Sequence, residues 1–275
     1  MTLKITTLIE NQPGEHKALI HEHGLSLYIE KDDCRILFDT GQSTAFLHNA
    51  RQMKIDLGRL DYVVLSHGHY DHSGGFTGLT KINKKFELYT GVGFFDEKFG
   101  YNGHTPEYLG NNFHENFLTD NGIKHHFVNQ QVLEIYPGIF IISNFIRNHE
   151  DETVNPRFKI FKDNTFYPDQ FEDEIMLVID TPKGLAVLLG CSHPGMKNML
   201  DTAEKLLKKP IYAVVGGTHL VEADETSLDL SIAYLEKDTI QVIGVSHCTG
   251  QTAMDRLSHT NDRYSCNRTG SFMLI

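Results

Sequence analysis

Runs of alternating polar and apolar residues divide the first part of the chain into short elements. Residues 2–5 alternate as in a strand, and 25–29 and 35–38 are apolar runs separated by a polar turn, which predicts a hairpin. A helix is expected over about 43–54, where apolar residues recur near helical spacing and Ser43 can cap the first turn. The N-terminal part therefore combines strands with a helix.

The same alternation of strand and helix patterns continues through the second half. Residues 60–65 form a buried strand pattern that leads directly into a histidine-rich loop. Later elements are expected at 175–179 and 185–189 (a hairpin), 197–207 (helix), 211–215 (strand), 227–236 (helix), 239–245 (strand), from 251 (helix) and 271–275 (strand). This order favours a layered α/β fold. With no linker or low-complexity segment, we expect one domain, 1–275, built from two similar halves.

Two stretches, about 94–130 and 144–172, lack a clear period. The first mixes glycine, asparagine, histidine and aromatic residues, and Gly100–His104 and Leu109–Asn112 carry turn residues. We expect it to be either a substrate-facing insertion or a set of short helices.

Composition narrows the class of protein. The 275 residues are 40% hydrophobic and 22% charged, as in soluble globular proteins, and the start lacks the apolar core of a signal peptide. No apolar run approaches the about 20 residues of a membrane helix. A net charge of −11 argues against nucleic-acid binding. The four cysteines are widely spaced, which favours reduced thiols. We expect a cytoplasmic protein that acts on a small molecule, binds neither nucleic acid nor membrane, and has an oligomeric state left open.

The loop after the strand at 60–65 carries four potential metal ligands within six residues. These are His67, His69, Asp71 and His72. Imidazoles and a carboxylate suit zinc or iron(II). His67 and His69 project to one side of an extended loop and can share a metal, while Asp71 and His72 can address a second. The glycines of Ser73-Gly74-Gly75 are expected to bend the backbone so that these side chains converge.

Three later histidines each follow the end of an apolar strand. His193 lies in Gly190–His193, His219 ends Gly216–His219, and His247 begins the loop after the strand at 239–245. Active sites of layered α/β folds gather at such strand ends. We expect His193 and His247 to be ligands. His219 could equally bind metal, hold substrate or shuttle a proton.

Other polar residues near these strand ends have several possible roles. Asp39 ends the strand at 35–38 and could cap the next helix, act directly, or accept a hydrogen bond from a ligand histidine. Cys191 and Cys248 flank the site, and either could supply a soft ligand. We place Cys191 in support of the ligands and assign Cys248 to packing. His104 and His114, in the irregular stretch 94–130, could face substrate, and the remaining histidines, His23 among them, are expected to be surface or structural.

These residues resemble the metallo-β-lactamase superfamily. Its HxHxDH signature is present as His67-Gly68-His69-Tyr70-Asp71-His72, and a strand-terminal Asp39 precedes it. The resemblance implies a four-layer αββα sandwich (α+β within the broad α/β class), a mononuclear or dinuclear zinc, iron or manganese centre, and usually hydrolysis. The segments 190–193, 216–220 and 246–250 are similar to a subgroup of metal-dependent hydrolases related to archaeal dihydropterin ribofuranosylaminobenzene phosphate synthases.

The chain departs from the superfamily pattern at one position. Superfamily hydrolases commonly carry a metal-bridging Asp at the end of a later strand, but here the strand 185–189 ends in Gly190-Cys191-Ser192-His193. The resemblance then implies His193 as the third ligand of the first metal. A second metal would depend on Asp71, His72 and His247.

The interpretation that follows is a metal-dependent hydrolase of an ester, lactone or phosphodiester. A metal-bound water is its nucleophile, Asp71 orients that water, and His219 is a second candidate catalytic residue. The first alternative is a pterin-related transferase, in which the metals activate a leaving group without using water. The second is a metal-bound sensor without turnover.

Overall fold

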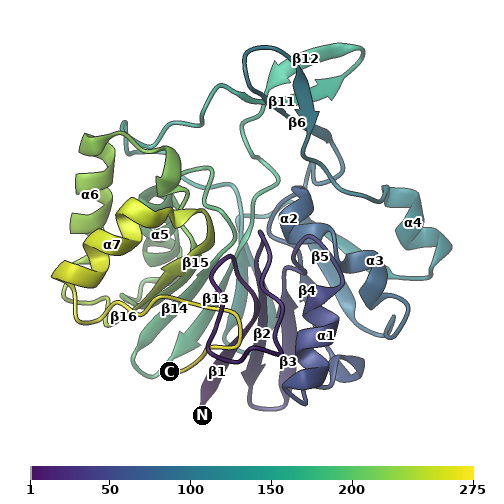
Figure 1. Cartoon of the computed structure of the whole chain (residues 1–275), viewed down its shortest axis with the longest axis horizontal. Coiled ribbons are helices and arrows are strands. Elements are labelled where there is room, and N and C mark those ends of the chain that lie inside the picture. Colours follow the sequence, from purple (N-terminus) through teal and green to yellow (C-terminus); the bar gives the residue numbers. More distant parts are fainter. Residues whose placement is uncertain (1) are drawn as a thin grey trace.

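The computed structural model describes residues 2–275, which form two large β-sheets packed face to face (Figure 1). Within these residues the first sheet has seven strands. Their order is β17 (Phe272–Leu274), β1 (Leu3–Ile9), β2 (Ser26–Lys31), β3 (Cys34–Phe38), β4 (Tyr62–Val64), β5 (Glu87–Gly91) and β8 (Lys124–Val128). The second sheet has the order β16 (Val242–Ser246), β15 (Ile211–Gly217), β14 (Gly184–Leu189), β13 (Met176–Thr181), β10 (Ile139–Ile142) and β9 (Val132–Tyr136).

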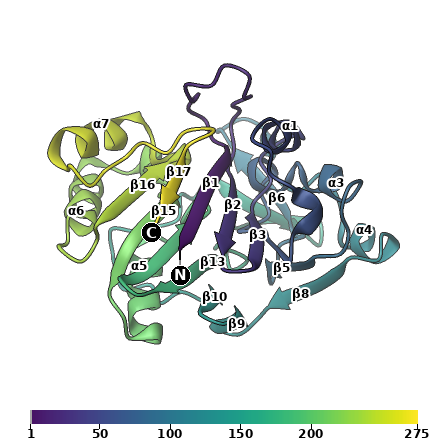
Figure 2. The same cartoon turned by 90° about the horizontal axis from the view of Figure 1, so that it is seen from below.

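Helices cover the outer face of each sheet. The helices beside the first sheet are α1 (Ala45–Gln52), α2 (Tyr70–Ser73), α3 (Phe76–Leu79) and α4 (Glu115–Asp120), with a short 3-10 turn at Leu57–Arg59. Those beside the second are α5 (Met196–Leu207), α6 (Glu225–Leu235) and α7 (Gln251–Thr260), with 3-10 turns at Leu220–Glu222 and His247–Thr249. Figure 2 shows the two helical groups on opposite sides of the sheets. The predicted αββα sandwich is therefore confirmed.

The strands of the inner layers are apolar on both faces, which explains their position. In β14, Leu185, Val187 and Leu189 pack against the helices of the second sheet. Ala186 and Leu188, which point the other way, pack between the two sheets. A third apolar cluster lies between the first sheet and α1, α3 and α4. Within residues 2–275, no helix has the length and apolar character needed to span a membrane.

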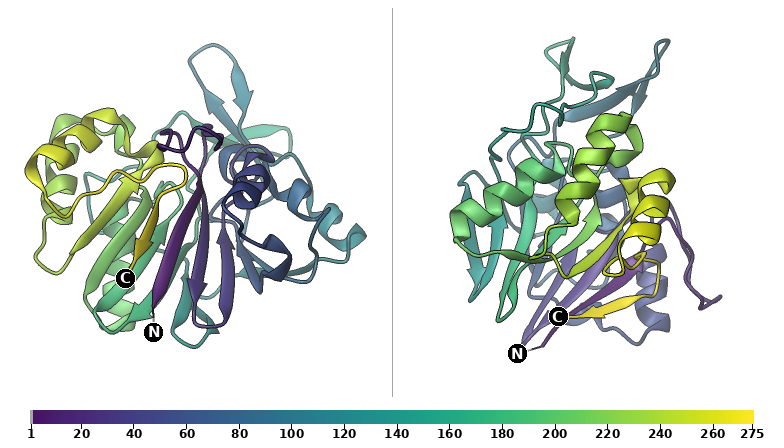
Figure 3. Two further views of the ribbon diagram at one scale, coloured as in Figure 1. Left: turned by 60° about the horizontal axis from the view of Figure 1, so that its bottom comes forward. Right: turned by 90° about the vertical axis from the view of Figure 1, so that its left-hand side faces the viewer.

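A small third sheet stands above one edge of the sandwich (Figures 1 and 3). Its strands are β12 (Thr165–Pro168), β11 (Phe158–Lys162), β6 (Glu97–Tyr101) and β7 (Pro106–Tyr108). The stretches 94–130 and 144–172, which lack a regular sequence period, therefore contain these four strands together with α4 and β8. The helix expected from Ser43 begins at Ala45; Ser43 Oγ accepts the Ala45 N–H at 3.1 Å, while Thr44 occupies the cap position.

Candidate metal centre

The carboxyl ends of the parallel strands in both sheets meet at one edge, beneath the small sheet. In the first sheet, β3 and β4 run parallel and lead to Asp39 and His67. In the second, β14, β15 and β16 run parallel and lead to 191–193, His219 and His247. Side chains from segments far apart in the sequence therefore face one another at this edge.

His67, His69 and His193 form the first cluster, with ligand nitrogens all within 4.8 Å of one another. His67 Nε2 lies 3.1 Å from His69 Nδ1, and the His193 ring stacks on Phe171 with centroids 3.7 Å apart. Burial lowers the pKa of all three imidazoles well below its usual range, so the rings are neutral. His193 Nε2 is buried and has no hydrogen-bond partner among the described residues. A buried nitrogen without a partner, beside two neutral imidazoles, fits a metal ion.

Asp71, His72 and His247 form a second cluster beside the first. His72 Nε2 lies 3.1 Å from His247 Nε2, and Asp71 Oδ2 lies 3.3 Å from His247 Nε2 and 3.6 Å from His72 Nε2. Burial alone would raise the pKa of Asp71, but the neighbouring His72 and the hydrogen bond from His23 bring it well below its usual range. The carboxylate is therefore ionised and able to bind a cation.

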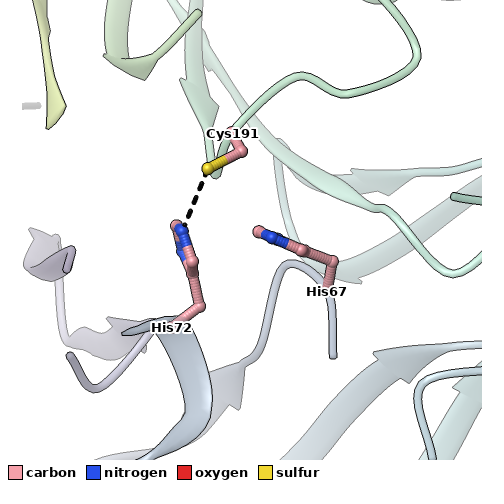
Figure 4. Close-up of side chains that lie close together, drawn as sticks. All are labelled: His67, His72 and Cys191. Atoms are coloured by element: carbon pink, nitrogen blue, oxygen red, sulfur yellow. Dashed lines mark hydrogen bonds between the residues drawn. The ribbon is translucent and has the colours of Figure 1, made fainter. Parts of the chain in front are cut away.

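The sulfur of Cys191 lies close to members of both clusters, and Figure 4 shows it facing His72 beside His67. Cys191 Sγ is 3.2 Å from His72 Nε2 and 3.4 Å from His247 Nε2, and it also lies within 4.8 Å of a ligand nitrogen of His67. From the sequence we expect this residue to support the ligands, whereas the structure places its sulfur among the potential ligand atoms themselves. Cys248 Sγ instead accepts the His219 N–H and donates to the Cys191 carbonyl.

Asp39 holds His72 from the side opposite the cluster. His72 Nδ1 lies 2.6 Å from Asp39 Oδ2 and donates its proton to that oxygen, so Nε2 is the ring nitrogen that faces the centre. The same carboxylate accepts the N–H and the hydroxyl of Ser66 at 2.7 and 2.8 Å. Of the three roles that the sequence leaves open for Asp39, the geometry matches the hydrogen bond to a ligand histidine; Asp39 does not cap α1.

Glu174 organises the loop that carries Cys191 and His193. Its fully buried carboxylate accepts the backbone N–H groups of residues 191, 192 and 193. Burial raises the pKa of this carboxyl to about 8. The three N–H groups hold the loop in one conformation, so Glu174 fixes where the two ligand atoms lie.

Two more buried carboxylates hold the other ligand loops. Asp173 accepts the Gly68 N–H at 2.8 Å and the Lys98 ammonium at 2.9 Å. Glu10, directly after β1 of the first sheet, accepts the backbone N–H of His247. The sequence did not predict a role for these residues. Their one signal is that each is an acidic residue close to the end of a strand.

Gly74 and Gly75 do not make the sharp backbone bend expected from the sequence. Their torsions are helical, with φ of −62° and −78°, so they do not bend the backbone sharply. A Cβ on Gly75 would lie 2.4 Å from the carbonyl oxygens of Ser43 and Thr40. Glycine is needed here because the loop 40–43 approaches too closely for a side chain.

The clusters form one wall of a cavity of about 320 Å³. The small sheet and the adjoining loops contribute Glu107, Leu109, Arg157 and Phe158 to its lining. His219 lines the same cavity, with its ring 4.2 Å from that of His193. It belongs to none of the close ligand groups among the described residues.

Comparison with known proteins identifies the family. Residues 21–85 match the profile of the metallo-beta-lactamase superfamily. The 7,8-dihydropterin-6-methyl-4-(beta-D-ribofuranosyl)-aminobenzene-5'-phosphate synthase of Methanocaldococcus jannaschii is 32% identical over 264 residues, covering 90% of this chain and 88% of that protein. The chain belongs to the metallo-β-lactamase superfamily.

Solved structures share this fold. Tm1679, described as a metal-dependent hydrolase of the β-lactamase superfamily, is 26% identical with a TM-score of 0.86, and the match covers 99% of both chains. A diphosphatase from the PhnP family shares the fold, with a TM-score of 0.57 and 14% identity, over 100% of this chain and 98% of that chain.

The strand end at Cys191 differs from the bridging Asp that the resemblance to this superfamily implies. The sequence lacks the expected bridging Asp at this strand end, and the sulfur occupies a point from which it can face both clusters. The clusters therefore hold imidazole, carboxylate and thiol groups that could bind metal ions.

The sequence pattern does not reveal one imidazole that lies at the site. His23, expected to be surface or structural, has Nε2 3.2 Å from Asp71 Oδ2 and lines the cavity. Its side chain is 52% exposed. It lies in the loop between β1 and β2, which carries no ligand motif, so only the folded arrangement reveals it.

Proposed function

We propose that this protein is a metal-dependent hydrolase that cleaves an ester, lactone or phosphodiester-type small molecule. The observation that carries the proposal is the convergence of two ligand clusters, with Cys191 close to members of both, in the wall of one cavity. One or two zinc ions are expected, with iron or manganese as alternatives, because imidazole, carboxylate and thiolate groups suit these metals. When bound, such an ion lowers the pKa of a coordinated water from 15.7 to about 7 and supplies hydroxide at neutral pH.

The chain's own side chains divide the remaining tasks. His67, His69 and His193 would hold the first ion, and Asp71, His72 and His247 the second. Asp71 lines the cavity and would also orient the attacking water. His219 lies beside the first cluster without joining it, in a position to contact substrate or carry a proton.

Arg157 favours a substrate with an anionic group. Its guanidinium lines the cavity, lies over the Phe158 ring at 4.1 Å and is held by Glu222, with Nε 2.7 Å from Oε1. A fixed guanidinium offers paired donors to a carboxylate or phosphate oxygen. The acidic chain as a whole provides no comparable attraction for an anion.

The proposal is tested with purified protein loaded with zinc, manganese or iron. It is assayed against phosphodiesters, lactones and carboxylic esters in H₂¹⁸O. We expect turnover with one class, and one ¹⁸O atom from solvent in the product. The His69→Ala variant is the control and should lose turnover together with metal. Stoichiometric metal and saturable ligand binding without turnover across the panel would support a sensor instead.

A second candidate is a transferase acting on a pterin. The observation that favours it is the 32% identity, over 90% of this chain, to the Methanocaldococcus jannaschii protein named as a dihydropterin-linked synthase. Incubation of the metal-loaded protein with a dihydropterin diphosphate, with and without an arylamine, separates the two candidates. Product that forms only when the arylamine is present supports the transferase; product that incorporates solvent oxygen without it supports the hydrolase.

A further inference from the structure

Asn11 lies between two imidazoles of the centre that come from distant segments. It follows β1, in the segment that runs beside the loop after β16 (Figure 3). Asn11 Oδ1 lies 3.0 Å from Gly24 N and 2.9 Å from His247 Nδ1. Asn11 Nδ2 lies 3.3 Å from His23 Nδ1. One amide group therefore contacts both rings.

The backbone of Gly24 fixes the orientation of this amide. A backbone N–H can only donate, so the Asn11 atom that faces it is the oxygen. The same oxygen faces His247 Nδ1, which must then carry a proton. The amide nitrogen faces His23 Nδ1, which must then accept. The proton of the neutral His23 ring is consequently on Nε2.

These opposite tautomers match what each ring faces on its other side. His247 Nε2, left with its lone pair, faces His72 Nε2, Cys191 Sγ and Asp71 Oδ2, the groups with which it would share a bound cation. His23 Nε2, which carries a proton, faces Asp71 Oδ2, an acceptor. His247 has a left-handed backbone with φ of 57°, and Glu10, the residue before Asn11, accepts its N–H. Two consecutive residues thus hold both the backbone and the ring of His247.

We propose that Asn11 is a positioning residue that keeps the proton of His247 on Nδ1 and the proton of His23 on Nε2. His247 is thereby made a metal ligand, while His23 is a hydrogen-bond donor to Asp71 and not a ligand, although its Nε2 lies within 4.8 Å of the ligand atoms of Asp71 and His247. The metal-binding part of this inference rests on the metal centre of the proposed function. The assignment of the two tautomers does not.

The tautomers are read directly from protein labelled with ¹⁵N-histidine and freed of metal. Long-range ¹H–¹⁵N correlation spectra are recorded at a pH where His23 is neutral, and His23→Gln and His247→Gln identify the two rings. We expect Nδ1–H for His247 and Nε2–H for His23. In Asn11→Asp the His247 ring should be unchanged, whereas His23 should move its proton to Nδ1, because it now faces an oxygen. In Asn11→Leu both rings should lose a single fixed tautomer. An Nε2–H signal for His247 in the natural protein would overturn the proposal.

Metal affinity provides the second measurement. Competition of zinc with a chromogenic chelator should show Asn11→Leu losing about 10- to 100-fold in affinity for one ion, while the ion at His67, His69 and His193 is retained. Asn11→Asp keeps the acceptor and should bind like the natural protein. Asn102→Leu is the matched control, because this exposed asparagine also accepts two backbone N–H groups, those of residues 104 and 105, away from the centre.

The outcomes separate this proposal from the proposed function. If Asn11→Leu binds zinc with the natural stoichiometry and affinity, the role of Asn11 in metal binding is rejected and the hydrolase proposal stands. If the natural protein binds no metal at all, the proposed function fails, together with the role of His247 as a ligand, while the spectra still decide the tautomers.

Discussion

At the level of single residues, buried carboxylates accept hydrogen bonds from almost every segment that carries potential ligands. Asp39, Asp173, Glu174 and Glu10 each accept hydrogen bonds from the loops that present the ligands. Backbone N–H groups and the Nδ1–H of His72 thus turn toward these carboxylates, which fixes the loops and leaves His72 Nε2 facing the centre. When ionised, the carboxylates would also offset the charge of bound cations.

Replacing Glu174 by glutamine tests this role. In the variant, the amide NH₂ would face a backbone N–H group that donates to a carboxylate oxygen in the natural protein. We therefore expect the free energy of unfolding to fall by about 1–3 kcal/mol. Urea unfolding at pH 9, where Glu174 is ionised, measures the change. Glu172→Gln, two residues earlier and exposed, removes the same charge and should leave stability unchanged. Equal effects of the two substitutions would show that charge, and not the loop contacts, matters.

Substitution of single histidines separates ligands from neighbours. His67→Ala and His69→Ala should each abolish metal binding at the first cluster, because two imidazoles hold a transition metal too weakly. His219→Ala should retain most of the metal, since its ring lies outside the close groups. Elemental analysis of the three purified variants measures this. Equal metal loss in all three would make His219 a ligand.

The sequence was informative for residues whose chemistry is concentrated locally. Four potential ligands within six residues, and histidines directly after apolar strands, are enough by themselves to indicate a metal site. His23 and Asn11 carry no such local signal. Their roles depend on the path of the β1–β2 loop, which brings them to His247, more than 200 residues away in the chain.

Among the elements, the small sheet is tied to the metal loop by a buried ion pair. Lys98 on β6 is 2% exposed, and its ammonium group lies 2.7 Å from Asp169 Oδ2 and 2.9 Å from Asp173 Oδ1. Asp173 in turn accepts the N–H of Gly68, between two ligand histidines. The cover of the cavity and the metal loop therefore share one carboxylate.

Replacing Lys98 by methionine should be strongly destabilising. It leaves two buried carboxylates without their cation, and we expect a loss of about 3–5 kcal/mol in the free energy of unfolding. Lys162→Met, at the exposed end of β11 in the same sheet, controls for removal of a lysine. Thermal and urea unfolding provide the measurement. A loss below about 1 kcal/mol, the value typical of surface pairs, would contradict the role assigned to Lys98.

The strands of this sheet could not be predicted for a physical reason. Sequence periodicity reports burial on one face, and β7 and β12 are exposed at every position. The strands β13 and β14 lie in the core and have uninterrupted apolar runs, so they were predicted close to their observed bounds. The strands β5 and β10, in which most positions are buried, were also not predicted, so exposure accounts for β7 and β12 alone.

For the whole molecule, the centre joins the two sheets. His67, His69, Asp71 and His72 follow the first sheet, while Cys191, His193 and His247 follow the second. Ions bound by both groups would hold the two halves together in addition to the apolar layer between the sheets. The unfolded chain has no such arrangement, so metal binding favours the folded state.

Removal of metal should therefore lower the stability of the whole protein. With free zinc at 100 times its dissociation constant, the gain is about 2.7 kcal/mol for one site. We expect the melting temperature to fall after dialysis against a chelator and to recover when zinc is restored. His67→Ala, which cannot hold the first ion, should show a smaller difference between the two conditions. An unchanged melting temperature in the natural protein would argue against ions that bridge the sheets.

The spread of ligands along the chain also sets an order of events during translation. The loop with His67, His69, Asp71 and His72 leaves the ribosome early, but the nitrogen donors of residues 193 and 247 follow much later. Glu10 precedes His247 by 237 residues, so its carboxylate can accept the His247 N–H only after that length of chain has been made. A nascent chain that has not reached residue 247 could therefore hold an ion through only part of the set, and the centre is completed only after His247 is made.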